Sequence, residues 1–205
     1  MSVGITPAEE NILKRRDDQK AQLTGERVVL RRLEVSDVTD RYVEWMNDPE
    51  VTQFLESRFV TQTRDSVSDF VASALATPDL EFFAIVDRAT QTHVGNIKLG
   101  PIDRNHMTAD VGLMIGERVF WGKGYGTQAI SLITQYAFDE LGLCKVTAGA
   151  YSNNLGSIRA FEKAGWQVEG TRPNAFRSGE GRVDHVLLGI SRPGDRPAKE
   201  QGLTR

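Results

Sequence analysis

Seven segments of the chain carry apolar residues in the pattern of β-strands, bounded by turn-forming residues. They cover residues 26–33, 81–87, 92–100, 108–115, 145–150, 166–170 and 182–190. The three strands between residues 81 and 115 follow one another directly, as in a meander, whereas the later strands alternate with helices. This order predicts a mixed sheet, mostly antiparallel, in a protein of the α/β class.

Four other segments repeat their apolar residues at helical spacing: residues 36–47, 63–76, about 125–141 and 154–164. The faces expected to pack on the sheet carry Val67, Phe70, Val71 and Leu75 in the second helix, and Ile130, Ile133, Ala137 and Leu141 in the third. Gly142 and Gly165 follow the last two helices, where a left-handed residue commonly ends a helix.

The two ends of the chain differ in composition from the part between them. Thr6, Pro7 and Glu9 form a helix-start signature, and a charged run with few apolar residues follows them. Residues 1–22 are therefore expected to form a charged helical extension. Residues 192–205 are rich in proline and glycine and are expected to be disordered. Residues 23–191 between them form the expected domain.

The chain has 205 residues, the length of one ordinary domain. Lys and Arg number 25 against 28 Asp and Glu, so no overall basic field draws the chain to nucleic acid or to an anionic membrane. Cys144 is the single cysteine, which fits a reducing compartment. No apolar run reaches the roughly 18 residues of a membrane span, and no secretory signal opens the chain. We expect a cytoplasmic protein without nucleic-acid or membrane partners.

The run from Trp121 to Thr127, Trp-Gly-Lys-Gly-Tyr-Gly-Thr, lies between a predicted strand and a predicted helix. Glycines at every second position let backbone N–H groups converge on an anion, and the helix N-terminus behind them adds partial positive charge. The spacing differs from the G-x-G-x-x-G of dinucleotide folds and from the P-loop. The run predicts a phosphate cradle; the alternative is a glycine-rich turn without a ligand.

The same run resembles the acetyl-CoA pyrophosphate loop of the GNAT superfamily of N-acetyltransferases, whose signature is Q/R-x-x-G-x-G/A. Gly124 and Gly126 match the signature, and Trp121 stands where Gln or Arg is usual. This W-G-x-G-Y form is similar to the RimJ/RimL-like branch, the relatives of ribosomal-protein alanine acetyltransferases. The resemblance covers about residues 23–190 and recurs in residues 25–31, 45–51, 95–97, 109–112, 152–157 and 161–166.

The resemblance implies a GNAT fold, with a V-shaped splay between two parallel strands and helices on both faces of the sheet. It implies acetyl-CoA as co-substrate, with the pantetheine running between the splayed strands. A β-bulge in residues 114–116 would then turn a backbone N–H toward the thioester carbonyl. The cofactor-binding positions that it implies are Met114, Ile115, Gly116, Trp121, Gly122, Lys123, Gly124, Tyr125, Gly126, Thr127, Asn154, Ser157, Phe161 and Lys163. No metal is expected, because the three histidines lack ligand spacing.

Asp110 stands where the branch often has a glutamate. Strand alternation places it with Gly112 and Met114 on one face, opposite Val111, Leu113 and Ile115. An amine with a pKa of about 8 to 10 is mostly protonated at neutral pH, so a nearby carboxylate can serve as general base. Asp110 could instead position the acceptor amine, or be a solvated carboxylate of the strand face.

The general acid is harder to assign, because Phe161 stands where many GNAT enzymes have the tyrosine that protonates the departing thiolate. Ser157 matches a serine of the branch and could donate to the sulfur, or help to cap the helix that begins at Asn154. Tyr151 is a second candidate donor, or else a core residue. Asn154 resembles a residue that binds a pantetheine amide, and it is also a plausible helix cap.

The resemblance permits several acceptors: a protein N-terminus, an amino-sugar nucleotide, a polyamine or an aminoglycoside. We expect a small-molecule or peptide amine, and homodimer formation is left open. The acceptor cleft is expected to be lined by Glu56, Arg58, Phe59, Asn174, Phe176 and Arg177. An arginine there could clamp an acidic acceptor. The alternatives are a catalytically idle acyl-CoA-binding module and a phosphate-binding fold of another kind.

Overall fold

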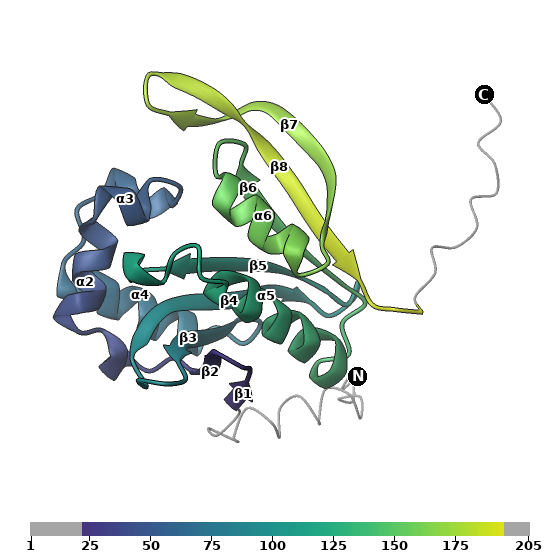
Figure 1. The fold of residues 1–205 in the computed structure, drawn as a ribbon, viewed down its shortest axis with the longest axis horizontal. Coiled ribbons are helices and arrows are strands. Elements are labelled where there is room, and N and C mark those ends of the chain that lie inside the picture. The colour runs from purple at the N-terminus through teal and green to yellow at the C-terminus, as the bar shows by residue number, and fades with distance from the viewer. Residues whose placement is uncertain (1–21, 195–205) are drawn as a thin grey trace, which may run out of the picture.

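An eight-stranded sheet forms the centre of the structure, a computed structural model that describes residues 22–194 (Figure 1). In space the strands follow the order β1-β2-β3-β4-β5-β6-β8-β7. Their bounds are β1 Gln22–Thr24, β2 Val28–Arg32, β3 Glu81–Asp87, β4 His93–Asp103, β5 Thr108–Ile115, β6 Lys145–Tyr151, β7 Gln167–Ser178 and β8 Gly181–Ser191. The N-terminal extension and the C-terminal tail expected from the sequence lie outside the described residues, apart from residue 22 and residues 192–194.

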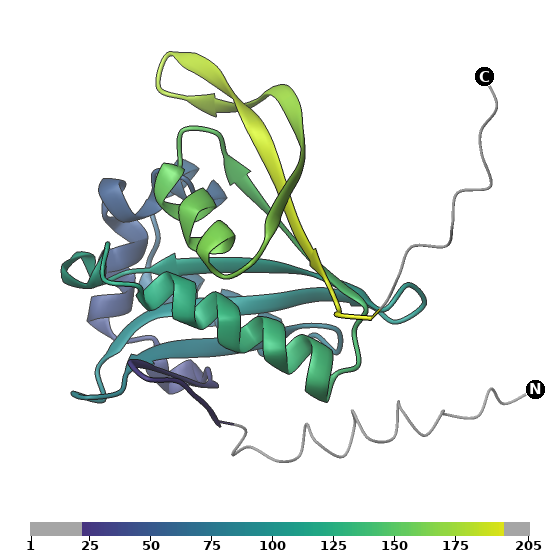
Figure 2. The same ribbon diagram turned by 45° about the vertical axis from the view of Figure 1, so that its right-hand side comes forward.

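All neighbouring strands pair antiparallel except β5 and β6, which are parallel. These two strands pair only from Thr108 with Lys145 to Asp110 with Thr147. Beyond that point β5 continues to Ile115 and β6 to Tyr151, but the two strands no longer pair with each other and diverge (Figures 1 and 2). The mixed sheet and its V-shaped splay are therefore confirmed. Strand edges that face a gap carry unpaired N–H and C=O groups, which can pair with an extended ligand.

Helices cover both faces of the sheet (Figure 2). The helical elements are η1 Val35–Asp37, α2 Asp40–Asn47, α3 Pro49–Thr52, η2 Glu56–Phe59, α4 Arg64–Ala76, η3 Arg118–Phe120, α5 Tyr125–Gln135, the π-helical turn η4 Tyr136–Glu140, and α6 Leu155–Lys163. Side chains of α5, η4 and α6 form one core with the sheet, and side chains of α2 and α4 form a second core on the other face. Alternate residues of β2 and β3 belong to different cores, as expected for strands buried on both faces.

The predicted apolar faces are largely confirmed, with one error in α4. The four residues expected from the helix after the glycine loop all lie in the first core. Val67 and Val71 lie in the second core, whereas Phe70 is 53% exposed and touches only the edge of the Phe82 ring, at a centroid distance of 6.2 Å. Residues 67, 71 and 74 make the buried stripe of α4, and position 70 lies on its flank.

Two element boundaries differ from the prediction. The expected helix over residues 36–47 is divided, because the Thr39 side chain accepts a hydrogen bond from the N–H of Tyr42 and starts α2 anew at Asp40. The strand expected at 166–170 extends to Ser178 and forms a long hairpin with β8, with register shifts after Val168 and Arg172. The short strand β1, which was not predicted, pairs along β2.

Candidate active site

The glycine loop presents its backbone outward between β5 and α5. Gly122 and Gly124 have φ angles of 71° and 84°, in the left-handed region that favours glycine, and Gly124 is the N-cap of α5. A Cβ added to either glycine would meet no atom within 4 Å, so open space lies over both. The N–H groups of the first turn of α5 have no partner within the helix. This geometry is that of the phosphate cradle expected from the sequence.

Side-chain hydrogen bonds hold both ends of this loop in place. Trp121, which replaces the usual Gln or Arg, donates its indole N–H to the carbonyl oxygen of Ile115 at 2.7 Å, while 40% of the residue stays exposed. Gln128 in the first turns of α5 accepts at 2.7 Å from the backbone N–H groups of both Arg27 and Val28. The loop is thus tied to the end of β5 and to the start of β2.

The segment that joins β5 to the loop has an irregular hydrogen-bond pattern just after β5, but both N–H groups concerned are bonded within the protein, so neither is the free N–H expected from the sequence. Within β5 the register against β4 is regular from Gly112 to Ile115. The N–H groups of Gly116 and Glu117 then share the carbonyl oxygen of Val94 as acceptor, at 2.9 and 3.1 Å, which is the bonding of a β-bulge. Trp45 packs directly on Gly116, where a Cβ would overlap the indole ring.

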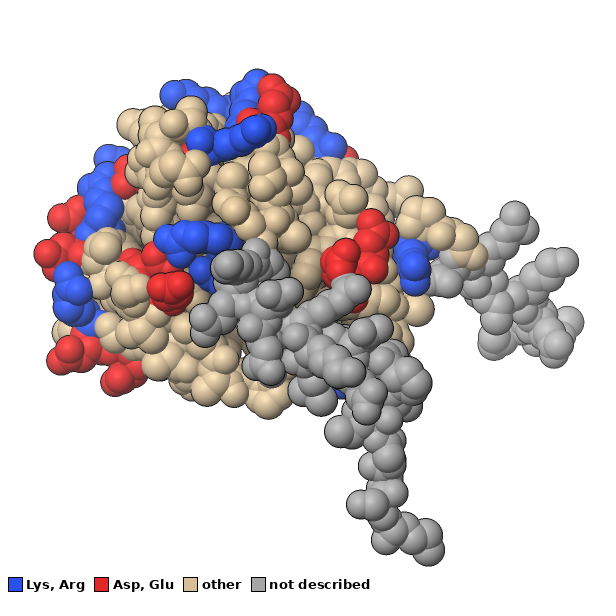
Figure 3. Space-filling view, turned by 90° about the horizontal axis from the view of Figure 1, so that it is seen from below, with Lys and Arg blue, Asp and Glu red and all other residues tan. Residues whose placement is uncertain are grey.

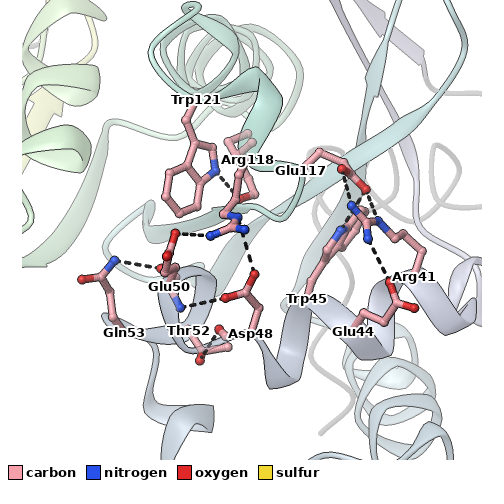
Figure 4. Close-up of polar contacts among 11 residues, drawn as sticks. Arg41, Glu44, Trp45, Asp48, Glu50, Thr52, Gln53, Glu117, Arg118 and Trp121 are labelled. Atoms are coloured by element: carbon pink, nitrogen blue, oxygen red, sulfur yellow. Dashed lines mark hydrogen bonds and ion pairs between the residues drawn. The ribbon is translucent and has the colours of Figure 1, made fainter.

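Charged side chains lock this segment to α2 and α3 (Figure 4). Glu117 accepts hydrogen bonds from the guanidinium of Arg41 and from the indole of Trp45, the latter at 3.1 Å. The bond from Arg41 lowers the pKa of the Glu117 carboxyl. Arg118 forms ion pairs with Glu50 and, at 3.6 Å, with Asp48. The end of β5 is therefore fixed to the helices α2 and α3.

Asp110 lies at the vertex of the V, where the pairing of β5 with β6 ends. Its carboxylate accepts a hydrogen bond from the hydroxyl of Thr147 on β6. Val111 lies in the first core and Met114 packs against the second, as the predicted alternation requires. Asp110 is exposed, so the structure places a solvent-accessible carboxylate on the face of the splayed strands that looks toward α2.

The family is decided by comparison with known proteins. The acetyltransferase (GNAT) domain family matches residues 27–167. This chain belongs to the GNAT acetyltransferases. An uncharacterized N-acetyltransferase, p20, of Bacillus licheniformis is 28% identical over 169 residues, which cover 81% of this chain and 93% of p20. The protein is an N-acetyltransferase.

Two solved GNAT structures show how closely the fold is shared. The spermidine N-acetyltransferase of Vibrio cholerae, in complex with CoA and spermine, superposes with a TM-score of 0.72 at 20% identity, covering 82% of this chain and 96% of that one. The ribosomal-protein-S5-alanine acetyltransferase of Vibrio fischeri gives a TM-score of 0.74 at 17% identity, covering 87% and 100%. At these identities the likeness concerns the fold.

Tyr151, at the end of β6, is buried and already has a partner in this acetyltransferase. Its hydroxyl donates to Glu56 Oε1 at 2.6 Å, and its ring stacks on Phe176 at 4.1 Å between centroids. The Arg58 guanidinium lies 5.1 Å from the ring centroid. Burial, followed by the bond to Glu56, raises the pKa of the phenol. Tyr151 is therefore protonated at neutral pH, with its proton directed at Glu56.

Arg58 bridges η2 to the β7–β8 hairpin. Two of its nitrogens donate to the backbone carbonyls of Leu55 at 2.8 Å and Arg177 at 3.0 Å, and its guanidinium lies over the Phe59 ring at 4.2 Å. An adjoining hollow of about 480 Å³ is lined by Met46, Asn47, Pro49, Thr52, Gln53, Arg58, Phe59, Val60 and Thr61. Of the expected cleft residues, only Arg58 and Phe59 line this hollow, and Arg58 holds the backbone rather than standing free as a clamp.

The site residues expected on α6 are separated by the structure. The Asn154 side chain accepts from the N–H of Ser157 at 3.2 Å, so Asn154 caps the helix and the Ser157 hydroxyl does not. That hydroxyl forms no hydrogen bond to any other residue within 22–194. Phe161 is 1% exposed and packs on Trp166 in the first core. Lys163 is exposed at the far end of α6 from Asn154.

Sequence reasoning missed Thr147 and Gly149, which lie on the same side of β6 as Tyr151. Thr147 bonds Asp110, and Gly149 leaves room for a ring from β8. A glycine inside a strand often marks a close approach, and that signal could have drawn attention to Gly149. No group of three His, Cys, Asp or Glu within the described range is placed to hold a metal ion.

Residues 22–194 contain no helix long and apolar enough to cross a membrane. Basic and acidic side chains are interspersed on the face shown in Figure 3. The described part of that face therefore offers no continuous basic surface.

Proposed function

We propose that this protein transfers the acetyl group of acetyl-CoA to a primary amine by direct attack in a ternary complex. The observation that carries the proposal is the glycine loop at the mouth of the splay. Its left-handed glycines, the open space above them and the helix N-terminus behind them suit the pyrophosphate of a CoA ester. The unpaired edges of β5 and β6 suit an extended chain such as pantetheine.

In this proposal the backbone holds the donor. Residues 121–127 contact the pyrophosphate, and the Met114–Gly116 segment pairs with pantetheine. The bulge at Gly116 lies at the end of that segment. We assign Ser157, in the first turn of α6, as the donor of a hydrogen bond to the departing sulfur, since no residue within 22–194 accepts its hydroxyl. Tyr151 is the second candidate donor, although its proton is directed at Glu56.

Asp110 serves the amine on the acceptor side of the sheet. Its exposed carboxylate attracts the ammonium form of the amine and can relay one of its protons to water. Proximity supplies the larger part of the rate, since two reactants held together replace a bimolecular encounter. Phe161 cannot donate a proton. A thiol with a pKa near 8.5 is nonetheless an acceptable leaving group without a strong acid.

The acceptor we propose is a peptide N-terminus or a small amine such as an amino-sugar nucleotide. The W-G-x-G-Y form of the loop and the likeness in fold to the ribosomal-protein-S5-alanine acetyltransferase support the RimJ/RimL-like branch and a peptide acceptor. The likeness to a spermidine acetyltransferase supports a small amine. We assign this activity to residues 23–191.

An acceptor screen tests the proposal. Purified protein is incubated with acetyl-CoA and, separately, with an alanine-initiated peptide amide, a UDP-amino sugar, spermidine and kanamycin. Release of free CoA thiol is followed, and the acetylated product is identified by mass. We expect at least one amine to accelerate thiol release well above the rate without amine. Tight acetyl-CoA binding without acceleration by any amine would indicate an idle acyl-CoA-binding module instead.

A further inference from the structure

His185 of β8 lies on the same face of the sheet as Asp110. It pairs in register with Tyr151 of β6 on one side and with Arg172 of β7 on the other. Residues that pair antiparallel point to the same side of a sheet, so His185 shares the face of Tyr151 and Thr147. Thr147 in turn holds the Asp110 carboxylate. The pairing of β5, β6, β8 and β7 thus places the imidazole on the acceptor side of the splay.

A glycine makes room for this imidazole. His185 Nε2 lies directly against the bare Cα of Gly149 on β6, at the place that a Cβ would occupy. The Phe176 ring packs on the imidazole at 4.7 Å between centroids and restricts its movement. Gly149 lies between Thr147 and Tyr151 along β6, in the part of the strand that diverges from β5. The imidazole therefore lies beyond Asp110, along that diverging part. The ring therefore packs on β6, on the same face of the sheet as the Asp110 carboxylate.

The surroundings of His185 favour the neutral imidazole. Partial burial, then the charge of Arg172, lowers the pKa of His185, while the charge of Asp110 acts in the opposite direction. Glu56 and Arg58 of η2 pair with each other beyond Tyr151, at 3.9 Å. Within residues 22–194 neither ring nitrogen of His185 has a hydrogen-bond partner. A neutral ring with a free nitrogen can accept a proton at neutral pH.

We propose that His185 receives the proton of the attacking amine, and that Asp110 stabilises the resulting imidazolium. This inference rests on the proposed acetyl transfer. The Asp110 carboxylate already accepts the Thr147 hydroxyl, which leaves it suited to act as a fixed counter-charge. A carboxylate that stabilises an imidazolium without taking its proton is an established arrangement in enzymes.

The proton balance is simple. The ammonium form of the acceptor first gives one proton to water. The neutral amine then attacks the thioester carbonyl carbon, the C–N bond forms and the C–S bond breaks. One N–H proton passes to Nδ1 of His185, because Nε2 lies against Gly149, and the thiolate leaves. The imidazolium afterwards loses this proton to solvent, and the CoA thiolate, which can accept a hydrogen bond from Ser157, gains one from solvent, so the products are the N-acetyl amide and free CoA thiol.

The test compares His185→Gln with His106→Gln, which changes an exposed histidine in the β4–β5 turn. The probe is whichever amine of the four-member screen the wild type acetylates fastest. We expect His185→Gln to lower kcat at least tenfold at pH values where the wild-type imidazole is neutral, while the Kd for acetyl-CoA is unchanged, and His106→Gln to match wild type. The acid limb of the wild-type kcat/KM profile is set by the ionisations of His185 and of the amine, and His185→Gln keeps only that of the amine.

A second variant tests the geometry separately. Gly149→Ala places a methyl group where the imidazole stands, so it is expected to lower kcat in the wild-type background and to add little in the His185→Gln background. The inference is overturned if His185→Gln keeps the wild-type kcat and the complete acid limb of the wild type. Acetylation of no amine by the wild type would overturn the proposed function itself, which is a different result.

Discussion

The two sides of the splay are built in different ways. On the side where we propose that the donor binds, the loop offers backbone N–H groups, and the Trp121 side chain fixes its shape at the Ile115 carbonyl. On the acceptor side, side chains from distant segments meet: Glu56 with Tyr151, Asp110 with Thr147, and His185 over Gly149. In the proposed function, the backbone binds the pyrophosphate that every CoA ester carries, and side chains distinguish one amine from another.

Substitutions on the two sides of the splay should therefore have separable effects on acetyl-CoA binding and on catalysis. Variants of the loop should alter the affinity for acetyl-CoA, and variants of the acceptor face should alter kcat without altering that affinity. Variants that touch neither should alter stability alone.

The largest effect is expected at the loop. Gly124→Asp places a carboxylate beside the pyrophosphate position and should weaken acetyl-CoA binding at least tenfold, measured by titration calorimetry. Gly124→Asn is the matched control, because asparagine tolerates the left-handed backbone and carries no charge. Equal affinity of a folded Gly124→Asp protein and wild type would remove the loop from the donor site.

The next effect concerns Asp110. Asp110→Asn removes the counter-charge of the His185 imidazolium and should lower kcat about tenfold, with an unchanged Kd for acetyl-CoA. Because the Asp110 charge raises the pKa of His185, its loss should also move the acid limb of kcat/KM to lower pH. Asp69→Asn, on the exposed side of α4, is the control. A profile of Asp110→Asn that overlays wild type would make Asp110 a surface carboxylate.

A smaller effect separates Asn154 from Ser157. Asn154→Ala removes the side chain that caps α6 and should cost about 1 kcal/mol in free energy of unfolding. Ser157→Ala keeps that cap, since the cap uses the backbone N–H of Ser157, and should leave the melting temperature unchanged. If Ser157→Ala lowers kcat at constant stability, its hydroxyl assists the thiolate; a lowered melting temperature with wild-type kcat would contradict that role.

The smallest effect is a pH dependence of stability from the partly buried His93. Burial between Tyr42 and Trp45 lowers the pKa of His93, so the unfolded chain takes up a proton at a higher pH than the folded one. The free energy of unfolding should therefore fall as pH drops below about 6.5, by no more than about 1.4 kcal/mol per pH unit for one proton. Denaturant melts of His93→Gln should show a flatter slope between pH 7 and 5, and His106→Gln should keep the wild-type slope.

The backbone shape of the glycine loop was predictable because its information is local. The glycines of residues 122–126 specify a backbone shape within a few residues, and the alternation of Asp110 with Val111 follows from strand geometry alone. The acceptor side required the spatial order β6-β8-β7, which the chain order does not reveal. Only that order places His185 beside Tyr151 and over Gly149. The long β7 was missed for a related reason, since its pairing with β8 overrides the local turn signals.

Initial-rate kinetics test most directly whether the amine attacks acetyl-CoA within a ternary complex. Rates are measured while acetyl-CoA and the best amine of the screen are both varied. Intersecting double-reciprocal lines, with no acetyl group on the protein after incubation with acetyl-CoA alone, are the result expected here. Parallel lines together with a protein heavier by one acetyl group would show an acetyl-enzyme intermediate and contradict the account.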